Sequence, residues 1–325
     1  MPLLEVKGLR THFFTRRGVV KAVDDVSFTL ERGETLGIVG ESGSGKSAMS
    51  LSLLRLVSEP GKIVDGQILF DGVDLLALDE RAMRDYRGRH MSMILQDPLS
   101  SLNPVLTVGD QVSEGIIIHD HLKGEALQKR VIELLKIVGI PAPDTRVSQY
   151  PHQLSGGMRQ RVVGAIAIAC RPELLIADEP TTSLDLTIQL QYLNQLKEIQ
   201  QRENLAMIIV THDFGVVAKM CDRVAVMYAG KIVETGRAED IFDRPRHPYT
   251  VALLNSAPRA DRLERLQSIE GQPPSLLNIP ARCSFYERCA DRFDRCLADV
   301  TPPSFDLSNG QFARCWKYES AAPQN

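Results

Sequence analysis

The chain has 325 residues, 43% of them hydrophobic and 24% charged, and its net charge is −3 at pH 7. This composition fits a globular protein with a sizeable core and excludes disorder over most of the length, while the near-neutral charge gives no argument for nucleic-acid binding. Because no apolar run approaches the ~20 residues that span a bilayer and residues 1–10 lack the pattern of a secretory signal, we expect a soluble, cytoplasmic chain of about two domains.

The first 30 residues alternate between apolar and polar side chains, which predicts β-strands. A short apolar run, Thr35–Gly40, then leads into a glycine-rich loop, and the leucine-rich segment 46–57 predicts a helix. A strand at 68–70 is followed by Asp71-Gly72, a pair typical of tight hairpin turns.

The middle of the chain, residues 98–160, is mostly helical in pattern, with apolar residues at helical spacing at Val131, Leu134, Leu135 and Val138. From residue 174 the pattern becomes strand, helix, strand. The two apolar strands, 174–177 and 207–210, flank a helical stripe made of Leu186, Leu190, Leu193, Leu196 and Ile199. Short apolar strands separated by helices predict a parallel sheet covered on both faces. A hairpin is expected over 224–233.

After about residue 244 the composition changes, because proline and arginine rise and long periodicity stops. We expect two domains, residues 1–257 and a small module at 258–325, with their boundary in the region 258–275. No internal repeat of 20–50 residues is present.

The glycine-rich loop carries the most specific motif. Residues 40–47 read GESGSGKS and fit the phosphate-binding pattern G-x-x-x-x-G-K-[ST] between a strand and a helix. Glycines let backbone N–H groups surround phosphate oxygens, the lysine reaches the β- and γ-phosphates, and the serine hydroxyl can bind Mg²⁺. The residues expected to hold ATP and Mg²⁺ here are Gly40, Ser42, Gly43, Ser44, Gly45, Lys46, Ser47 and Ala48.

Two carboxylates, Asp178 and Glu179, follow the strand at 174–177. Ligands of open α/β sheets bind at this end of the strands. Asp178 is expected to act as a partner of Mg²⁺, and Glu179 can activate a water for attack on the γ-phosphate.

The chain has six cysteines. Cys170 and Cys221 lie in apolar stretches and are interpreted as small buried hydrophobic residues. The other four gather near the C-terminus: Cys283, Cys289, Cys296 and Cys315. A reducing compartment disfavours a disulfide pair, whereas four thiolates suit either structural zinc, despite the absence of close C-x₂₋₄-C pairs, or an iron–sulfur cluster.

Further motifs identify a family. Residues 154–161 read LSGGMRQR, Gln96 follows a strand-like segment, residues 183–185 read SLD, and His212 follows the strand at 207–210. With the P-loop and the Asp-Glu pair, they stand in the order found in ATP-binding-cassette (ABC) ATPases, which the chain closely resembles. Met158 replaces the usual glutamine of the LSGGQ signature.

This resemblance implies a P-loop NTPase (RecA-like) α/β core with an antiparallel β subdomain and an α-helical subdomain, followed by a small cysteine-rich module. It also implies two cassettes that face head to tail, with ATP between the P-loop of one and the signature of the other. Glu179 would be the catalytic base, His212 would orient the γ-phosphate and the water, and Gln96 would help hold Mg²⁺ and sense a membrane subunit. The signature residues that would touch the partner's ATP are Ser155, Gly156 and Gly157.

Two further features bear on the resemblance: the aromatic that would stack on adenine and the length of the helical segment. Phe13 and Phe14 lie near the position of the aromatic that stacks on adenine, but the adjoining 15–20 stretch leaves the choice between them open. The segment between Gln96 and Ser155 has the length of a transporter's helical subdomain and lacks the heptads or cysteines of DNA-repair relatives.

Residues toward the C-terminus resemble one particular group of ABC ATPases. Residues 271–274 (GQPP), 280–285 (PARCSF) and 247–250 (HPYT) resemble the ATPases of dipeptide and oligopeptide importers and of relatives that carry nickel, glutathione or opines. That group implies a [4Fe–4S] cluster on the four cysteines, with zinc as the alternative. It also implies two permeases, a substrate-binding protein, a related second ATPase (or a homodimer), and a peripheral position on the cytoplasmic face of the inner membrane. The alternative is a non-transport ABC ATPase, such as a translation or repair factor.

Overall fold

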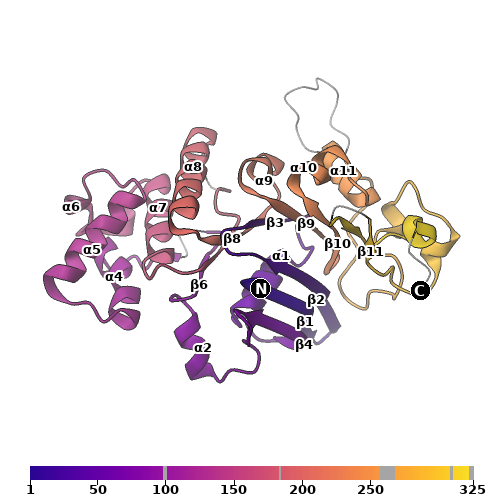
Figure 1. Ribbon diagram of the computed structural model, residues 1–325, viewed down its shortest axis with the longest axis horizontal. Helices are drawn as coiled ribbons and strands as arrows, with labels where there is room; N and C mark the ends of the chain where they lie inside the picture. Colours follow the sequence, from indigo (N-terminus) through magenta and orange to yellow (C-terminus); the bar gives the residue numbers. More distant parts are fainter. Residues whose placement is uncertain (98–100, 183, 257–267, 308–309, 322–325) are drawn as a thin grey trace. The chain divides into compact units, whose positions relative to one another are not determined.

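The computed structural model describes residues 1–97, 101–182, 184–256, 268–307 and 310–321 (Figure 1). These residues form two compact units, each drawn from separate parts of the sequence. The first comprises Met1–Leu3, Leu30–Thr35 and Ala77–Val210, and the second comprises Leu4–Thr29, Leu36–Leu76 and Thr211–Asn325. The predicted division at residue 257 stays a prediction, because it falls on residues 257–267, which lie outside the described part of the chain.

The first unit contains a parallel sheet in which β7 (Leu174–Asp178) lies between β6 (Met91–Ile94) and β8 (Ala206–Thr211). The register pairs Met91 with Leu174, and Leu174 with Ala206. Every residue of β7 and β8 is buried, as expected for short apolar strands that are covered on both faces.

Helices make up the rest of the first unit: α2 (Glu80–Tyr86), α4 (Val108–His119), α5 (Gly124–Ile137), α6 (Pro143–Arg146), α7 (Gly156–Ala167) and α8 (Leu186–Glu203), with a 3₁₀ turn η1 (Pro151–Gln153). Figure 1 shows α4, α5 and α7 packed together, and each pair of them is in contact. Thr107 begins α4 with a reciprocal capping box to Asp110, which fixes where this helix starts.

The apolar stripe predicted for α8 is only partly buried. Leu193, Leu196 and Ile199 are buried, whereas Leu186 is 72% exposed and Leu190 is 44% exposed. Sequence spacing places these side chains on one helical face but does not say how far along the helix the core extends.

The second unit contains β3 (Thr35–Val39), which runs parallel to β9 (Arg223–Tyr228), and the predicted hairpin from β9 to β10 (Lys231–Arg237). Two very short strands, β11 (Phe305–Asp306) and β12 (Phe312–Ala313), extend this sheet beyond β10. Its helices are α1 (Lys46–Leu53), α9 (Phe214–Met220), α10 (Ala238–Asp243) and α11 (Pro248–Ser256). The helix expected over 46–57 ends earlier, because Arg55 adopts a left-handed backbone conformation (φ 53°) that interrupts the helix.

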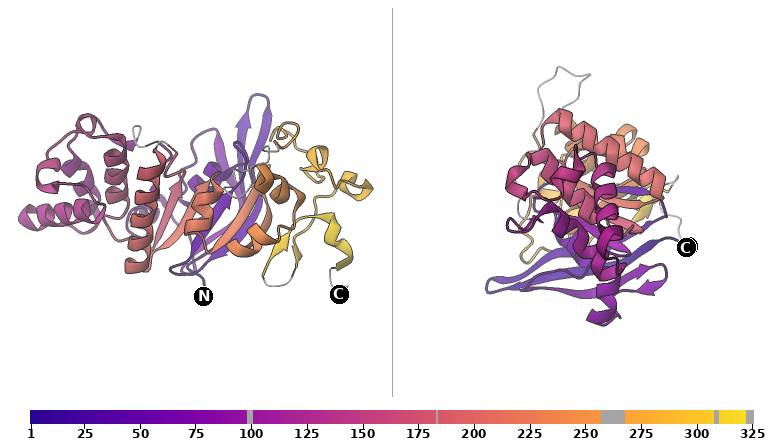
Figure 2. Two further views of the ribbon diagram at one scale, coloured as in Figure 1. Left: turned by 90° about the horizontal axis from the view of Figure 1, so that it is seen from above. Right: turned by 90° about the vertical axis from the view of Figure 1, so that its left-hand side faces the viewer.

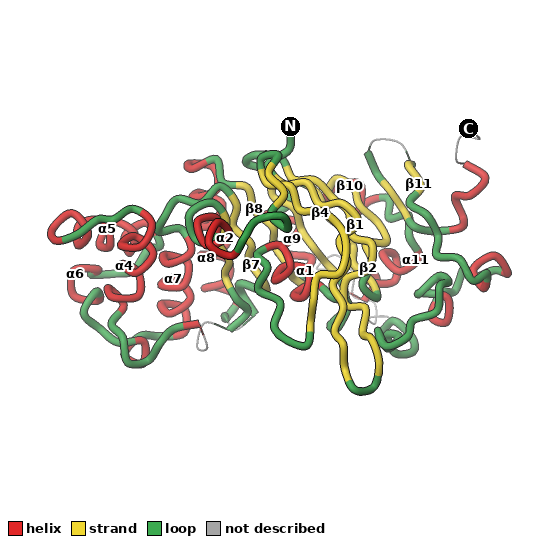
Figure 3. Tube along the Cα trace, turned by 90° about the horizontal axis from the view of Figure 1, so that it is seen from below, coloured by secondary structure: helices red, strands yellow, loops and turns green. Residues whose placement is uncertain are grey.

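A second, antiparallel sheet in this unit has the strand order β2 (Gly18–Leu30), β1 (Leu4–Thr15), β4 (Gly61–Phe70) and β5 (Val73–Asp74). Figure 3 shows β2, β1 and β4 side by side. The turn from β4 to β5 places both Asp71 (φ 48°) and Gly72 (φ 82°) in the left-handed region. That requirement explains the Asp-Gly pair in the sequence.

The C-terminal residues of the second unit follow an irregular path with three 3₁₀ turns, η2 (Tyr286–Arg288), η3 (Asp294–Leu297) and η4 (Trp316–Ala321). They lie beside β10 and α11 in Figure 1, and the left view of Figure 2 likewise shows the yellow C-terminal segment next to the orange one. Part of this segment joins the edge of β2, since Lys21 donates a backbone hydrogen bond to Leu276 and Val20 bridges to Leu277.

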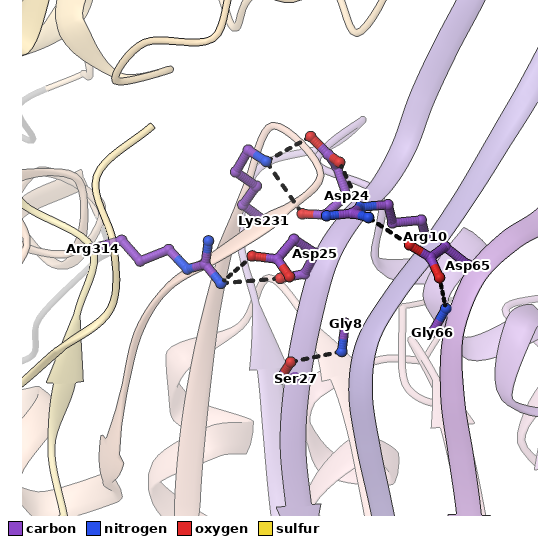
Figure 4. A network of polar contacts seen from close by, with 9 residues as sticks. All are labelled: Gly8, Arg10, Asp24, Asp25, Ser27, Asp65, Gly66, Lys231 and Arg314. Atoms are coloured by element: carbon purple, nitrogen blue, oxygen red, sulfur yellow. Dashed lines mark hydrogen bonds and ion pairs between the residues drawn. The ribbon is translucent and has the colours of Figure 1, made fainter. Parts of the chain in front are cut away.

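An ion pair also ties this segment to β2. Arg314 donates to the Asp25 carboxylate at 2.9 Å and to the Asp25 carbonyl at 3.1 Å, and the neighbouring Asp24 accepts from Lys231 of β10 at 2.6 Å (Figure 4). The residue before Cys315 is therefore fixed on the second unit by charge-assisted hydrogen bonds. Within the described residues, no helix combines the length and the apolar character needed to cross a membrane.

Candidate functional site

The loop between β3 and α1 is shaped by glycines. Gly40 (φ 156°) and Gly45 (φ 104°) have positive backbone angles, and a Cβ on either would overlap a backbone carbonyl oxygen, that of Met227 for Gly40 and that of Ala22 for Gly45. Only glycine fits these two positions, so the chain can turn tightly enough to aim its N–H groups into the loop.

Lys46 begins α1 and lies under the loop, with only 6% of its surface exposed. Its ammonium group donates to the carbonyl oxygens of Gly40 (2.8 Å) and Glu41 (2.9 Å). The Ser44 hydroxyl is also buried and has no hydrogen-bond partner among the described residues. A buried cation, an unpartnered hydroxyl and an N-cap glycine without a side chain favour binding of an anion at the start of this helix.

Glu179 follows β7 and is held by two neighbours in the first unit. The Gln96 amide and the Thr182 hydroxyl each donate to its Oε2 atom at 2.9 Å. The Glu179 backbone adopts a left-handed conformation (φ 46°), and its N–H donates to the carbonyl of Val210 at 2.8 Å. Asp178, one residue earlier, is 4% exposed. The fold thus brings Gln96 and Glu179 into contact although they are far apart in the sequence.

The signature segment forms the start of α7. Ser155 is the N-cap, and its hydroxyl accepts from the Met158 N–H at 3.3 Å. Ser155 and Gly156 are both exposed at the helix N-terminus. A Cβ on Gly157 would approach the Ile188 side chain to 2.9 Å. Farther along α7, the buried Gln160 amide donates to the carbonyl of Pro180 at 2.9 Å, which connects the signature helix to the loop after Glu179.

The remaining predicted residues lie at element ends. Ser183 lies outside the described residues, while Asp185 caps α8 by accepting from the Ile188 N–H at 3.1 Å. His212 follows β8 and belongs, like the P-loop, to the second unit. Phe14 is 47% exposed, and Phe13 packs against Gly61.

Sequence reasoning missed three side chains that contact the motifs. Thr182 holds Glu179, Tyr249 of α11 accepts from the Glu41 N–H at 2.8 Å, and Arg288 pairs with the Glu41 carboxylate. Thr182 could have been found from its position three residues after Glu179. The other two contacts span more than 200 residues and leave no local signal.

The four C-terminal cysteines gather in the second unit. Cys289, Cys296 and Cys315 are buried, and Cys283 and Cys296 share an apolar cluster with Phe305 and Trp316. Burial is the main reason that the pKa of the Cys283 thiol is raised to about 12, and the charges of the other three cysteines contribute to the same rise. Burial likewise raises the pKa of Cys289 and of Cys315. Of the four, Cys283 and Cys296 meet in one apolar cluster.

Their arrangement differs from a formed metal site. Within the described ranges, no three His, Cys, Asp or Glu side chains are placed so that they could hold a metal ion. All six cysteines are described and none forms a disulfide. Cys221 is buried as expected, but Cys170 is only half-buried, and burial raises its pKa to about 11.

Two family models match the chain. The model described as "ABC transporter" matches residues 23–182, and the one described as "Oligopeptide/dipeptide transporter, C-terminal region" matches residues 233–296. The second match includes the first three of the four cysteines.

Relatives match over nearly the whole length. The chain is 49% identical to the oligopeptide transport ATP-binding protein OppD of Bacillus subtilis over 99% of this chain and 90% of the relative. It is also 49% identical to the dipeptide transport ATP-binding protein DppD of the same organism, over 98% of this chain and 96% of the relative.

Solved structures confirm the predicted fold class for the cassette. The dimeric post-hydrolysis state of the ATP-binding cassette MJ0796 with ADP and Pi superposes with a TM-score of 0.66 at 26% identity, covering 72% of this chain and 98% of that chain. cbiO1 from Clostridium perfringens, part of the ABC transporter complex cbiONQ, gives 0.63 at 28% identity, covering 75% of this chain and 91% of that chain. The chain therefore belongs to the oligopeptide/dipeptide transporter family of ABC ATP-binding proteins.

Proposed function

We propose that this chain is the ATP-hydrolysing subunit of an importer for dipeptides and oligopeptides. The observation that carries the proposal is the Glu179 carboxylate, held at the end of a buried strand by the Gln96 amide and the Thr182 hydroxyl, in a chain that also has a complete P-loop. The names of the full-length relatives supply the substrate class.

Hydrolysis needs a base beside the γ-phosphate. A water oxygen bonds to the γ-phosphorus while the bond to the β–γ bridging oxygen breaks, so ADP leaves with the electron pair and Glu179 accepts the proton of the water. Gln96 and Thr182 donate to the same carboxylate oxygen and thereby fix the orientation of the base. His212 orients the γ-phosphate and the water.

The P-loop binds the nucleotide, because its backbone N–H groups and the Lys46 ammonium neutralise phosphate charge. The donor set of Ser47, Gln96 and Asp178 consists of hydroxyl, amide and carboxylate oxygens, which are the ligands that Mg²⁺ prefers. These residues would hold the ion, which neutralises phosphate charge when it is bound. The exposed Ser155 and Gly156 are available to the ATP of a second cassette.

The exposed leucines on α8 support a paired cassette. Leu186 and Leu190 precede the buried part of the helix and give it an apolar surface. The partner cassette is a related second ATPase, and a homodimer is the alternative. In the assembled importer the chain lies on the cytoplasmic face of the inner membrane, bound to two permeases that receive substrate from a binding protein.

We further infer that Cys283, Cys289, Cys296 and Cys315 hold a [4Fe–4S] cluster, with structural zinc as the alternative. The residue types fit, because four gathered thiols are the donor set of either site. Burial raises the pKa of Cys283 to about 12, so this thiol stays protonated at neutral pH until a cation compensates the thiolate. The four thiols would hold the group only after a rearrangement, because no three such side chains among the described residues are placed to ligate a metal ion.

The cluster is tested by Cys296→Ser, with Cys170→Ser in the first unit as the matched control. We expect Cys296→Ser to lose iron and the absorbance near ~400 nm and the control to keep both. Unchanged iron and absorbance in Cys296→Ser would refute the assignment, and stoichiometric zinc without iron in the wild-type chain would establish the alternative.

The transport role is tested by affinity purification of the tagged chain from detergent-solubilised membranes. Co-purification of two permeases and a second ABC ATPase supports it. Recovery with ribosomes or DNA instead identifies a non-transport ABC ATPase.

A further inference from the structure

An ion pair joins the cysteine module, defined here as residues 283–315, to the phosphate-binding loop. Arg288 donates from Nη1 to Glu41 Oε2 at 2.6 Å and from Nη2 to Glu41 Oε1 at 2.9 Å. This is the two-pronged geometry that makes arginine–carboxylate pairs strong and directional. The Arg288 side chain is 5% exposed and that of Glu41 is 24% exposed, so water screens the pair less than it screens a surface ion pair.

Several neighbours hold the arginine in place. Its Nε donates to the carbonyl of Glu270 at 3.0 Å, and Nη1 also lies 3.3 Å from the Tyr228 hydroxyl. The guanidinium lies 5.9 Å from the ring centroids of both Tyr228 and Phe285. The hydrogen bond to Glu41 is the main reason that the pKa of Arg288 is raised, so this residue stays charged at every working pH.

The same aromatic group anchors the backbone of Glu41. Tyr249, which accepts from the Glu41 N–H, packs against Tyr228 with ring centroids 4.4 Å apart and against Phe285 at 5.4 Å. Phe285 belongs to the cysteine module and is 3% exposed. The module therefore reaches Glu41 in two ways, through Arg288 to its carboxylate and through the aromatic rings to its N–H.

Glu41 needs this compensation because of where it lies. It follows Gly40 in a loop that binds a polyanionic phosphate chain, and its carbonyl oxygen accepts from Lys46. An uncompensated carboxylate there would repel the phosphates. The forked pair removes most of that repulsion and also fixes the direction of the carboxylate.

We propose that Arg288 is a positioning residue for nucleotide binding: it neutralises and orients Glu41, so that the cysteine module sets the affinity of the phosphate-binding loop for a nucleoside triphosphate. This inference rests on the proposed ATPase function. It assigns the module a role in the cassette's own chemistry, whichever metal its cysteines hold.

The test is the dissociation constant for MgATP of the full chain, measured by displacement of a fluorescent ATP analogue. The variants are Arg288→Ala, Glu41→Gln and the double variant. Arg282→Ala is the matched control, because Arg282 lies in the adjoining turn but pairs at 3.0 Å with the exposed Glu287. We expect Arg288→Ala to bind MgATP about tenfold more weakly, with the loss in KM and not in kcat at saturating ATP.

The double variant separates charge from packing. Since Glu41→Gln removes the repelling carboxylate, it is expected to bind at least as well as the wild type and to restore binding when combined with Arg288→Ala. Arg282→Ala should match the wild type. Arg288→Lys, which keeps the charge and loses the fork, should fall between the wild type and Arg288→Ala, and it provides a readout even where the alanine variant folds poorly.

Two results would overturn the proposal. One is wild-type affinity in both Arg288→Ala and Arg288→Lys. The other is a loss that Glu41→Gln fails to repair, which would mean that Arg288 acts only through the fold of the module. A wild-type chain that binds no nucleotide would instead refute the proposed function itself.

Discussion

Replacement of Glu179 by glutamine is the sharpest test of the assigned chemistry. The substitution keeps the size and shape of the side chain and a carbonyl oxygen that can accept from Gln96 and Thr182, the two donors now 2.9 Å from Oε2. It removes the negative charge and with it the ability to take a proton from water. Loss of a general base lowers kcat by about 10²–10⁴-fold, equivalent to about 3–5 kcal/mol of transition-state stabilisation.

The assay is phosphate release at saturating MgATP, together with the dissociation constant for ATP. We expect Glu179→Gln to bind ATP as the wild type does and to accumulate as an ATP-bound cassette pair, visible as a larger species in light scattering. The matched control is Glu173→Gln. Glu173 directly precedes β7, at the end of the strand opposite to Glu179, and its carboxylate accepts from His90 at 2.9 Å. The reasoning fails if Glu179→Gln retains more than about a tenth of the wild-type kcat.

The remaining predictions concern the loop, the carboxylate's partner and a buried histidine. Lys46→Ala is expected to weaken ATP binding itself by at least about tenfold, as measured by equilibrium dialysis, because it removes a buried ammonium from the phosphate site. Gln96→Ala should lower kcat at saturating MgATP by about tenfold, since Glu179 loses an orienting donor; equal kcat in both proteins would contradict this. Burial lowers the pKa of His247 from 6.5 to about 4, and its Nδ1 accepts from the Tyr249 N–H, so the folded state requires the neutral ring. The unfolded chain therefore binds this proton first, and the free energy of unfolding should fall by about 2–3 kcal/mol between pH 6.5 and pH 4. Urea titrations should find a smaller fall in His247→Gln, and an equal one would exclude His247 as the cause.

The parts of the structure that sequence reasoning could predict are those set by local pattern. The all-buried strands β7 and β8 follow from short apolar runs, and the Asp71-Gly72 turn follows from the backbone angles that it requires. The P-loop glycines are specified equally closely, because neighbouring carbonyl oxygens leave no room for a side chain.

The parts that sequence reasoning missed depend on contacts between distant residues. Arg288 contacts Glu41 across more than 240 residues, and the sequence around either residue gives no sign that the two pair. The strands β11 and β12 have two residues each, too few to produce a period. Leu186 is exposed despite its place in an apolar stripe, since the pattern cannot tell a core from a surface that awaits a partner.

Peptide uptake tests the central claim most directly. Cells that lack this chain would be complemented with the wild-type chain or with Glu179→Gln, and the uptake of a labelled tripeptide would be followed over time. Our account predicts that the wild-type chain restores uptake and that Glu179→Gln, expressed at the same level, does not. Equal uptake in the deleted and the complemented cells, for tripeptides and for dipeptides alike, would contradict it.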